Sequence, residues 1–324
     1  MHSSTVALPS SLSFQLFTRT PCTGIKSTPN SNSYIVETPR GELKTSQVIH
    51  ATNAWSSHLI PGMRRKIVPT RVHMSAQRPG QGLTTDPDSG HSWAGTRAFV
   101  FYPSSVAIAF DYLTQLLPYT TSSPTLQHSS SETLTYNNYP PTYGELMFGG
   151  GELVGGRSEQ ALMDNIGVTD DSDTDFEICA YLGGSLERYF ANWGLEATLP
   201  KDEDGKEIER MWGKGRVKAM WTGIMGLSAD MKPWVGRIPT KISGRREPRA
   251  ERSRLAPPGE WIAAGYSGEG MAHAWLSGRA LASMLLGGKT GEKECEMELP
   301  PPFLITEKRW KKANIKNLMG DLDT

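Results

Sequence analysis

The fold of this chain is decided by the stretch WIAAGYSGEGMAHAWLSGRALASMLL, residues 261–286. It begins with a short apolar run, residues 261–264, that is typical of a buried strand. Three glycines follow within six residues: Gly265, Gly268 and Gly270. From Met271 onward the residues are mostly small or apolar and include no proline, over a length that allows about four turns of helix. The stretch therefore predicts a strand, a glycine turn and a buried helix.

A turn of this kind directs backbone N–H groups and the positive end of the helix toward one point, which suits an anion or an electron-rich ring edge. Ordinary packing of a helix on a strand gives the same pattern, so the glycines alone leave both interpretations open. Residues 268–273, GEGMAH, nearly match the dinucleotide fingerprint, but His273 stands where the third glycine should be. The later segment 291–298 offers no strand with the acidic residue that should bind a ribose. The stretch is therefore not the pyrophosphate loop of a Rossmann unit.

Length and composition narrow the class of protein. A chain of 324 residues, 37% of them hydrophobic, can bury a sizeable core and is expected to form two lobes. Lys plus Arg and Asp plus Glu both total 34, so the charge balance favours neither nucleic acid nor a membrane as partner. No apolar run reaches the ~18 residues of a membrane span. A start unlike a signal peptide and three widely spaced cysteines predict a cytoplasmic protein without a disulfide framework or a metal site.

The rest of the chain is punctuated by short strand patterns. Runs of β-branched and aromatic residues predict strands over 14–20, 34–38, 48–55, 66–74, 97–102, 106–112, 145–153 and 216–221. Pro69 indicates an edge strand or a bulge. Helical spacing predicts a helix over 176–193, in which Cys179 is a small core residue. Residues 222–239 are expected to form a glycine-punctuated loop and strand, and the basic runs 244–254 and 307–312 solvated loops.

Three of these stretches together resemble one family. They are VIHATNAW at 48–55, WTGIMGLSADMKPWVG at 221–236 and GYSGEGM at 265–271. In this order they are similar to the FAD-dependent amine and amino-acid oxidoreductases of the D-amino-acid oxidase, sarcosine oxidase and glycine oxidase superfamily. Residues 64–74 and FDYLTQ at 110–115 look like its fungal members. The resemblance extends from about Phe14 to Leu286.

The resemblance implies a FAD site. In the family the Ala-Thr strand end lies beside the dinucleotide part of FAD, and the Gly-Tyr-Ser-Gly turn with its helix faces the pyrimidine side of the flavin ring. Amides at the helix start would there stabilise the negative charge of the reduced ring. Met220 stands where some relatives carry a flavin-linking cysteine, so FAD is expected to be non-covalent. The expected cofactor-binding residues are Ala51, Thr52, Asn53, Ala54, Trp55, Met220, Gly265, Tyr266, Ser267, Gly268, Glu269, Gly270 and Met271.

The activity implied by the resemblance is oxidation of a C–N bond in a small-molecule amine or amino acid. Hydride passes from the substrate carbon to the flavin, so placement against the flavin carries most of the chemistry. The candidate catalytic residues are Arg71, Tyr112, Trp221 and Asp230, with Arg97, Tyr102 and Tyr143 as further candidates for contacts to a substrate carboxylate. Each of them also has an ordinary structural interpretation. Asp230 is expected to orient a loop, and His73 and His273 to be packing or hydrogen-bonded residues.

The expected architecture is α/β (α+β) with two interwoven lobes. A truncated FAD-binding lobe is expected from 14–62, 161–210 and 255–287, a mixed-sheet substrate lobe from 63–160 and 211–254, and tails at 1–13 and 288–324. The family opens with a strand and a Gly-x-Gly-x-x-Gly turn for the FAD pyrophosphate, and nothing like it precedes Phe14. The strands near 48–53 and 261–265 should then lack neighbours. The alternatives are an inactive fragment acting at most as a binding module and, ranked last, a nicotinamide-dependent dehydrogenase suggested only by residues 268–270.

Overall fold

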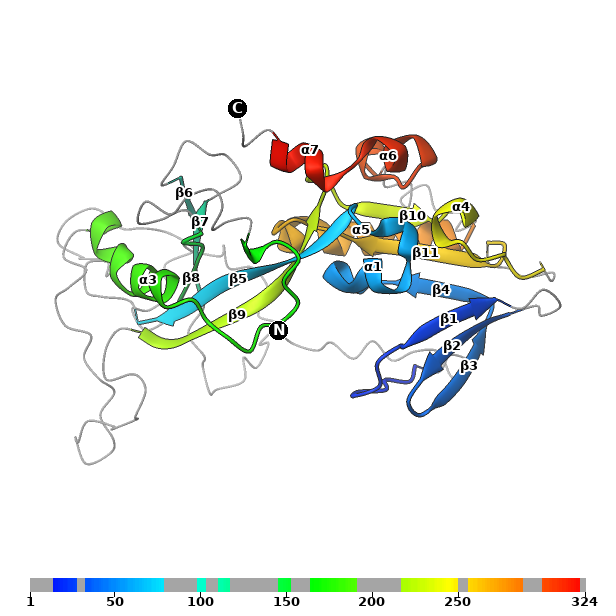
Figure 1. The fold of residues 1–324 in the computed structure, drawn as a ribbon, viewed down its shortest axis with the longest axis horizontal. Helices are drawn as coiled ribbons and strands as arrows, with labels where there is room; N and C mark the ends of the chain where they lie inside the picture. The colour runs from blue at the N-terminus through cyan, green and yellow to red at the C-terminus, as the bar shows by residue number, and fades with distance from the viewer. Residues whose placement is uncertain are drawn as a thin grey trace, which may run out of the picture. The chain divides into compact units, whose positions relative to one another are not determined.

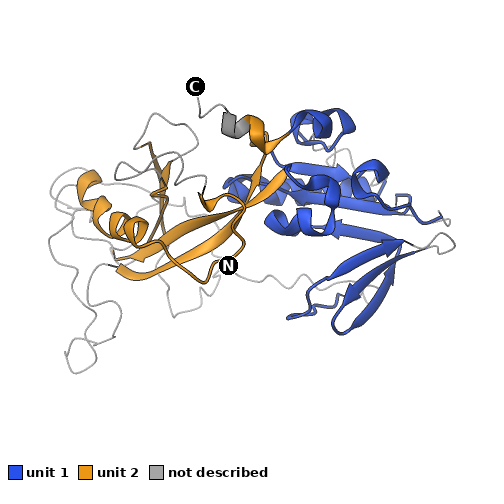
Figure 2. Cartoon of the chain, viewed as in Figure 1, with its two compact units in different colours: residues 1–66, 232–313 blue, residues 67–231, 314–324 orange. Residues whose placement is uncertain are grey.

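The computed structural model describes residues 14–27, 33–78, 98–102, 110–116, 145–152, 164–190, 217–249, 256–287 and 299–320. The chain forms two compact units, which Figure 2 shows in separate colours. Unit 1 comprises residues 1–66 and 232–313, and unit 2 comprises residues 67–231 and 314–324. Unit 1 contains two three-stranded sheets and unit 2 one five-stranded sheet, and each unit has its own core.

Unit 1 is built on a three-stranded sheet in the order β10-β11-β4 (Figure 1). Its strands are β4 (Gln47–His50), β10 (Trp234–Arg237) and β11 (Gly259–Ala264). β11 runs parallel to β4 and antiparallel to β10, and all six of its residues are buried. One face of β11, with Trp261 and Ala263, packs against Leu281 of the helix α5 (Gly270–Leu285). The strand, turn and helix are those that residues 261–286 predict, but the expectation of a buried helix is wrong. Only Ser277, Ala280 and Leu281 of α5 are buried, because one side of the helix alone packs on the sheet.

A separate antiparallel meander belongs to unit 1. It consists of β1 (Gly24–Ser27), β2 (Tyr34–Thr38) and β3 (Gly41–Thr45), with β2 in the middle. The short helices of this unit are η1 (Asn53–Trp55), α1 (Ser56–Leu59), η2 (Pro61–Met63), α4 (Thr240–Ser243), η5 (Pro301–Phe303) and α6 (Glu307–Lys312). Residues 14–20 are irregular, and the strand expected there is wrong. Phe14 and Leu16 are each about three-quarters exposed, so this segment has no buried face to stabilise a strand.

The end of the chain is not simply a tail. Leu304 forms a bridge with Val235, and the buried Ile305 donates its N–H to the same residue's carbonyl. The guanidinium of Arg309 lies 3.7 Å from the ring centroid of Trp234 and donates to the carbonyl of Pro233. Residues 307–312, expected to be a solvated loop, therefore form a helix held by stacking on a buried tryptophan.

Unit 2 is built on an antiparallel sheet of five strands in the order β6-β7-β8-β5-β9. They are β5 (Ile67–Gln77), β6 (Ala98–Phe101), β7 (Asp111–Gln115), β8 (Leu146–Gly149) and β9 (Val217–Ser228). β9 continues through the region expected to be a loop after Trp221, because it pairs with β5 along nearly its whole length. The short helix α7 (Ile315–Gly320) also belongs to this unit. Pro69 lies in β5 opposite Gly226 of β9, in a part of β5 that β8 does not reach, since β8 pairs with β5 only from Met74 to Gln77.

One face of the five-stranded sheet is covered by the helix α3 (Phe176–Tyr189). The side chain of Asp175 caps this helix by accepting from the N–H groups of Glu177 and Ile178. The core between sheet and helix contains Leu113, Leu146, Phe148, Ile178, Leu182 and Leu186. This placement differs from the expected boundaries, which assigned 161–210 to the FAD lobe. The apolar face of α3 is complementary to the sheet of unit 2, and sequence spacing alone does not show which sheet a helix covers.

In the part of the chain that the structure describes, no helix is long and apolar enough to cross a membrane. Nor do the described residues contain a group of three or more His, Cys, Asp or Glu side chains that could hold a metal ion.

Candidate functional site

The end of β4 and the turn after β11 are joined by one side chain. Asn53 accepts a hydrogen bond from the N–H of Gly265 at 2.8 Å and from that of Tyr266 at 3.3 Å, both through Oδ1. Asn53 itself has a φ of 43°, a left-handed conformation that Asn tolerates better than most residues. Two segments that are 212 residues apart therefore meet within unit 1. They are two of the three stretches that carry the family resemblance.

The turn itself depends on left-handed backbone. Gly265 has a φ of 77°, Ser267 of 51° and Gly268 of 91°. Glycine adopts these angles without the clash of a side chain, which explains the glycines on either side of Tyr266 and Ser267. Burial raises the pKa of the Tyr266 phenol.

The turn leads directly into α5. The N–H groups of Ala272 and His273 bond to the carbonyl of Glu269, so the helix begins at Gly270. The first N–H groups of a helix have no partner within it and carry its partial positive charge. The backbone N–H groups of Gly270 and Met271 at the start of α5 therefore fit the electron-rich edge of a flavin ring. The N–H groups of Gly265 and Tyr266, however, donate to Asn53, so these two amides stabilise the turn and do not face a ligand.

The rest of the β4 end is compact. Ala54 is buried, Ala51 and Trp55 are exposed, and the hydroxyls of Thr52 and Ser56 lie 3.1 Å apart. Small side chains here allow close approach to the backbone. The structure thus brings together the predicted cofactor residues 51–55 and 265–271 within unit 1, whereas Met220 belongs to unit 2.

A buried ion pair lies in the same sheet and was not predicted. Glu260 in β11 is bonded to Nε2 of His50 in β4 at 2.9 Å and to the guanidinium of Arg245 at 2.8 and 2.6 Å. Burial by itself raises the pKa of this carboxyl, but the bonds to His50 and Arg245 outweigh it and hold the pKa at about 2. The network ties β4 to β11 just before the Asn53 contact. A glutamate inside the apolar run of residues 259–264 is the sequence signal that could have indicated it.

In unit 2, the face of the sheet opposite α3 is uncharged over most of its area. Side chains alternate along each strand, and this open face includes Val72, Met74, Val100, Tyr112, Met147 and Trp221. Apart from Lys218 in the bulge at one end, which pairs with Glu145, no charged side chain of the five strands lies on it. Val100 is 54% and Trp221 37% exposed. A half-exposed sheet face normally carries polar residues, so this one has the composition of a binding surface.

Tyr112 lies flat across the middle of this face. Its hydroxyl donates to the sulfur of Met74 at 2.8 Å, over the intervening strand at Gly149. A Cβ on Gly149 would collide with both the Met74 sulfur and the Tyr112 ring. Burial raises the pKa of the Tyr112 phenol to about 12, so it stays neutral at physiological pH. The glycine at this position therefore has a packing role.

The other candidate residues are spread over unit 2. Arg71 lies on the α3 side of β5, the opposite side from Tyr112 and Trp221, with its Nε bonded to Asn165. Met220 packs into the core under α3. Asp230 accepts from the hydroxyl of Ser228 at 2.9 Å in the turn after β9. Of the four catalytic candidates, the structure brings only Tyr112 and Trp221 to one face, and none of the four is thereby assigned a role.

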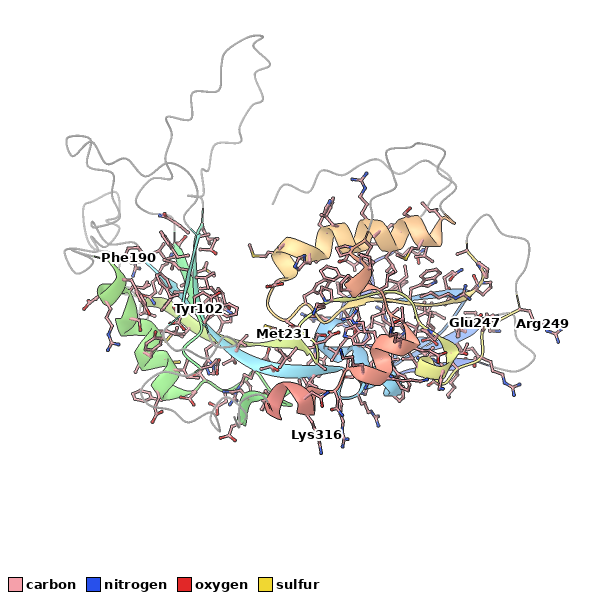
Figure 3. The ribbon with its side chains drawn as sticks, turned by 90° about the horizontal axis from the view of Figure 1, so that it is seen from above. Tyr102, Phe190, Met231, Glu247, Arg249 and Lys316 are labelled. Atoms are coloured by element: carbon pink, nitrogen blue, oxygen red, sulfur yellow. The ribbon has the colours of Figure 1, made fainter. Side chains whose placement is uncertain are left out.

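The two histidines have hydrogen-bonding partners. His73 accepts the N–H of Asp175 through Nε2 at 3.0 Å and faces Glu152 through Nδ1. His273 pairs with Glu269 at 3.1 Å, one turn earlier on α5. Arg97 and Tyr143 lie outside the described residues, and Tyr102 lies at the end of β6, where Figure 3 labels it.

Comparison with known proteins gives a family. The model of the family "FAD dependent oxidoreductase" (DAO) matches residues 7–284. No curated protein matches the chain in sequence. Among solved structures, the chain is similar to glycine oxidase from Geobacillus kaustophilus, with 17% identity, a TM-score of 0.47 and coverage of 89% of this chain and 52% of that one.

Two further solved structures give similar values. L-Proline dehydrogenase from P. horikoshii has 18% identity and a TM-score of 0.42, with 84% of this chain and 50% of that chain covered. Fructosyl amine: oxygen oxidoreductase from Aspergillus fumigatus has 11% identity and a TM-score of 0.44, with 87% and 48% covered. The chain thus spans about half the length of the structures it matches.

Proposed function

The chain belongs to the family of FAD-dependent oxidoreductases, and from this premise we propose that it takes part in oxidising a C–N bond of an amine or amino acid with non-covalent FAD. Members of this family act on amines and amino acids. When bound, FAD accepts the hydride that leaves the substrate carbon. The chain spans about half the length of its structural matches, so the statement that it has the activity of a whole enzyme is also a proposal.

The observation that carries the proposal is the contact of Asn53 with Gly265 and Tyr266. It holds the end of β4 and the start of α5 side by side, so that residues 51–55 and 268–271 border one region of unit 1. We assign the α5 amides of Gly270 and Met271 to the electron-rich edge of the flavin, because a helix start favours negative charge.

The unit 2 side chains support non-covalent binding and a role in holding the substrate. Met220 lies in the core with α3 and has no nucleophile to link a flavin. Tyr112 and Trp221 are assigned to substrate contact, because both lie on the uncharged open face.

A direct test is anaerobic mixing of the FAD-loaded chain with amines and amino acids, followed by flavin absorbance. The proposal predicts bleaching of the flavin by at least one substrate and recovery on admission of oxygen. A chain that binds FAD but is bleached by none of them would retain the cofactor site and lose the reaction. If the chain does not bind FAD at all, the proposed function is refuted.

A second candidate, an inactive fragment that acts as a binding module, is favoured by two exposed surfaces of unit 1. β4 pairs only with β11 among the described strands, and Ile49 in it is 52% exposed. On α5 the side chains of Met271 and Trp275 are 92% and 82% exposed. Parallel strands are rarely left with an open edge, and a helix with large exposed apolar side chains normally has a partner.

The two candidates separate in one experiment. Addition of a polypeptide that contains the Gly-x-Gly-x-x-Gly strand and helix of a family member should raise the affinity for FAD if the open edge of β4 completes a flavin site. If that polypeptide binds without any gain in FAD affinity, the module interpretation is preferred. The control is the same mixture with Ile49→Lys, which places a charge on the edge and should prevent the pairing.

A further inference from the structure

The open face of unit 2 carries a continuous row of aromatic and thioether side chains. The ring centroids of Tyr102 and Phe110 are 6.1 Å apart, and those of Phe110 and Tyr112 are 6.4 Å apart. The Tyr112 hydroxyl reaches the Met74 sulfur, and Met74 is paired in register with Trp221. These five residues, Tyr102, Phe110, Tyr112, Met74 and Trp221, are called the aromatic wall below.

The wall is accessible and is fixed in shape. Tyr102 is 66% and Trp221 37% exposed, at the two ends of the row. Tyr112 is held in its flat position because Gly149 leaves room for it and Met74 accepts its hydroxyl. A ring bound here would therefore meet a surface that is already ordered, which reduces the loss of side-chain entropy on binding.

The charge pattern of the open face selects among ligands. Within the described strands the only cation on or near it, Lys218, is engaged by Glu145, and Arg71 lies on the other side of β5. A charged group placed against the wall would lose its hydration without gaining a partner. An aromatic ring gains offset or edge contacts with the tyrosines and the indole, and a thioether makes a favourable contact with ring edges.

We propose that the aromatic wall binds the ring of an arylalkylamine, an amine whose non-reacting end is an uncharged aromatic group. This inference rests on the proposed function, for which it names the substrate class. The described strands of unit 2 favour such an amine over amino acids with a charged side chain, because nothing among them supplies the counter-charge.

The test is calorimetric titration of the full chain with 2-phenylethylamine and with ethylamine, which lacks the ring. We expect the ring to strengthen binding by about two- to tenfold for each ring contact it makes, both with and without FAD. Trp221→Leu and Tyr112→Leu should remove most of that gain, so that the two amines bind these variants with similar affinity. The matched control is Phe176→Leu on α3, an aromatic residue that is 84% exposed outside the wall and should change neither titration.

The outcomes distinguish this inference from the proposed function. Equal affinities for the two amines would overturn the proposed binding of a ring to the aromatic wall, and so would an equal loss of affinity for 2-phenylethylamine in Phe176→Leu and Trp221→Leu. Neither result would bear on FAD binding. If 2-phenylethylamine binding depends on Trp221 but the chain does not bind FAD, the proposed ring-binding site is supported and the proposed FAD-dependent oxidation is rejected. Sedimentation that shows a dimer dissociated by Trp221→Leu would overturn the inference, because a second copy would then occupy the face.

Discussion

The Oδ1 atom of Asn53 lies 2.8 Å from the backbone nitrogen of Gly265, although 212 residues separate them in the sequence. The same oxygen accepts the N–H of Tyr266, so one short side chain satisfies two amides of a turn made of left-handed residues. A turn with two amides fixed in this way enters α5 at a defined angle. We infer that the candidate FAD site depends on these hydrogen bonds from the Gly265 and Tyr266 amides to Asn53.

Asn53→Ala should lower the free energy of unfolding of unit 1 by about 1–3 kcal/mol, because two turn amides lose their acceptor. Asn53→Asp keeps the acceptor and should lose less. Urea denaturation of the three proteins, followed by the signal of the unit 1 tryptophans, measures both effects. Equal stability of the wild type and Asn53→Ala would show that the contact does not hold the turn.

Glu260 should make the stability of unit 1 depend on acid. Its pKa is about 2 in the folded chain against an ordinary value of 4.5, as the bonds to His50 and Arg245 outweigh the effect of burial. Because the folded pKa is the lower one, the stabilisation is present above about pH 4.5 and is lost as the pH falls toward 2.

The free energy of unfolding measured across that range should fall as the pH is lowered. Glu260→Gln should reduce this free energy at neutral pH by about 3–5 kcal/mol and should make it depend less on pH in acid. Lys26→Met, which removes an exposed ion pair with Glu37, is the control and should change little. An acid profile that Glu260→Gln leaves unchanged would assign the loss to other carboxyls.

Gly149→Ala should destabilise unit 2 by about 1–3 kcal/mol, because the added methyl forces apart the Tyr112 ring and the Met74 sulfur. Gly184→Ala on α3 is the matched control, since nothing lies within 4 Å of its added Cβ. There the helix should gain a few tenths of a kcal/mol to about 1 kcal/mol. If both glycines respond alike to thermal denaturation, the packing role of Gly149 is wrong.

The exposed surfaces of unit 1 should make the chain self-associate. Ile49 on the open edge of β4 and Trp275 on α5 are 52% and 82% exposed, and both are large and apolar. Ile49→Lys with Trp275→Lys should therefore increase the monomer fraction in analytical ultracentrifugation. Phe176→Lys, also at an exposed aromatic residue but in unit 2, serves as comparison. A wild-type chain that is monomeric at every concentration would contradict this expectation.

The strand, turn and helix at residues 261–286 could be predicted because local rules act together there. An apolar run, glycines and a proline-free segment agree with β11, its turn and α5. The strand β6 and the helix α3 were predicted for the same reason, whereas β7 covers Asp111–Gln115 and shares only residues 111 and 112 with the strand expected at 106–112. What failed was assignment between sheets, because the apolar face of α3 does not specify its partner.

Long-range pairing explains the other differences. Glycines at 223 and 226 suggested a loop, yet β9 is held there by its pairing with β5. Residues 307–312 look solvated in sequence, yet stacking of Arg309 on Trp234 holds a helix. Within the candidate site, residues 51–55 and 265–271 were predicted from the resemblance, whereas the buried Glu260 network depends on contacts that no local pattern reveals.

The most direct test of the central claim is titration of the chain with FAD, followed by quenching of flavin fluorescence, in the wild type, Asn53→Ala and Asn53→Asp. The account predicts saturable binding that is released on denaturation, that is weakened in Asn53→Ala and that is largely kept in Asn53→Asp. Saturable binding that is equally strong in all three proteins, or no binding in any of them, would contradict it.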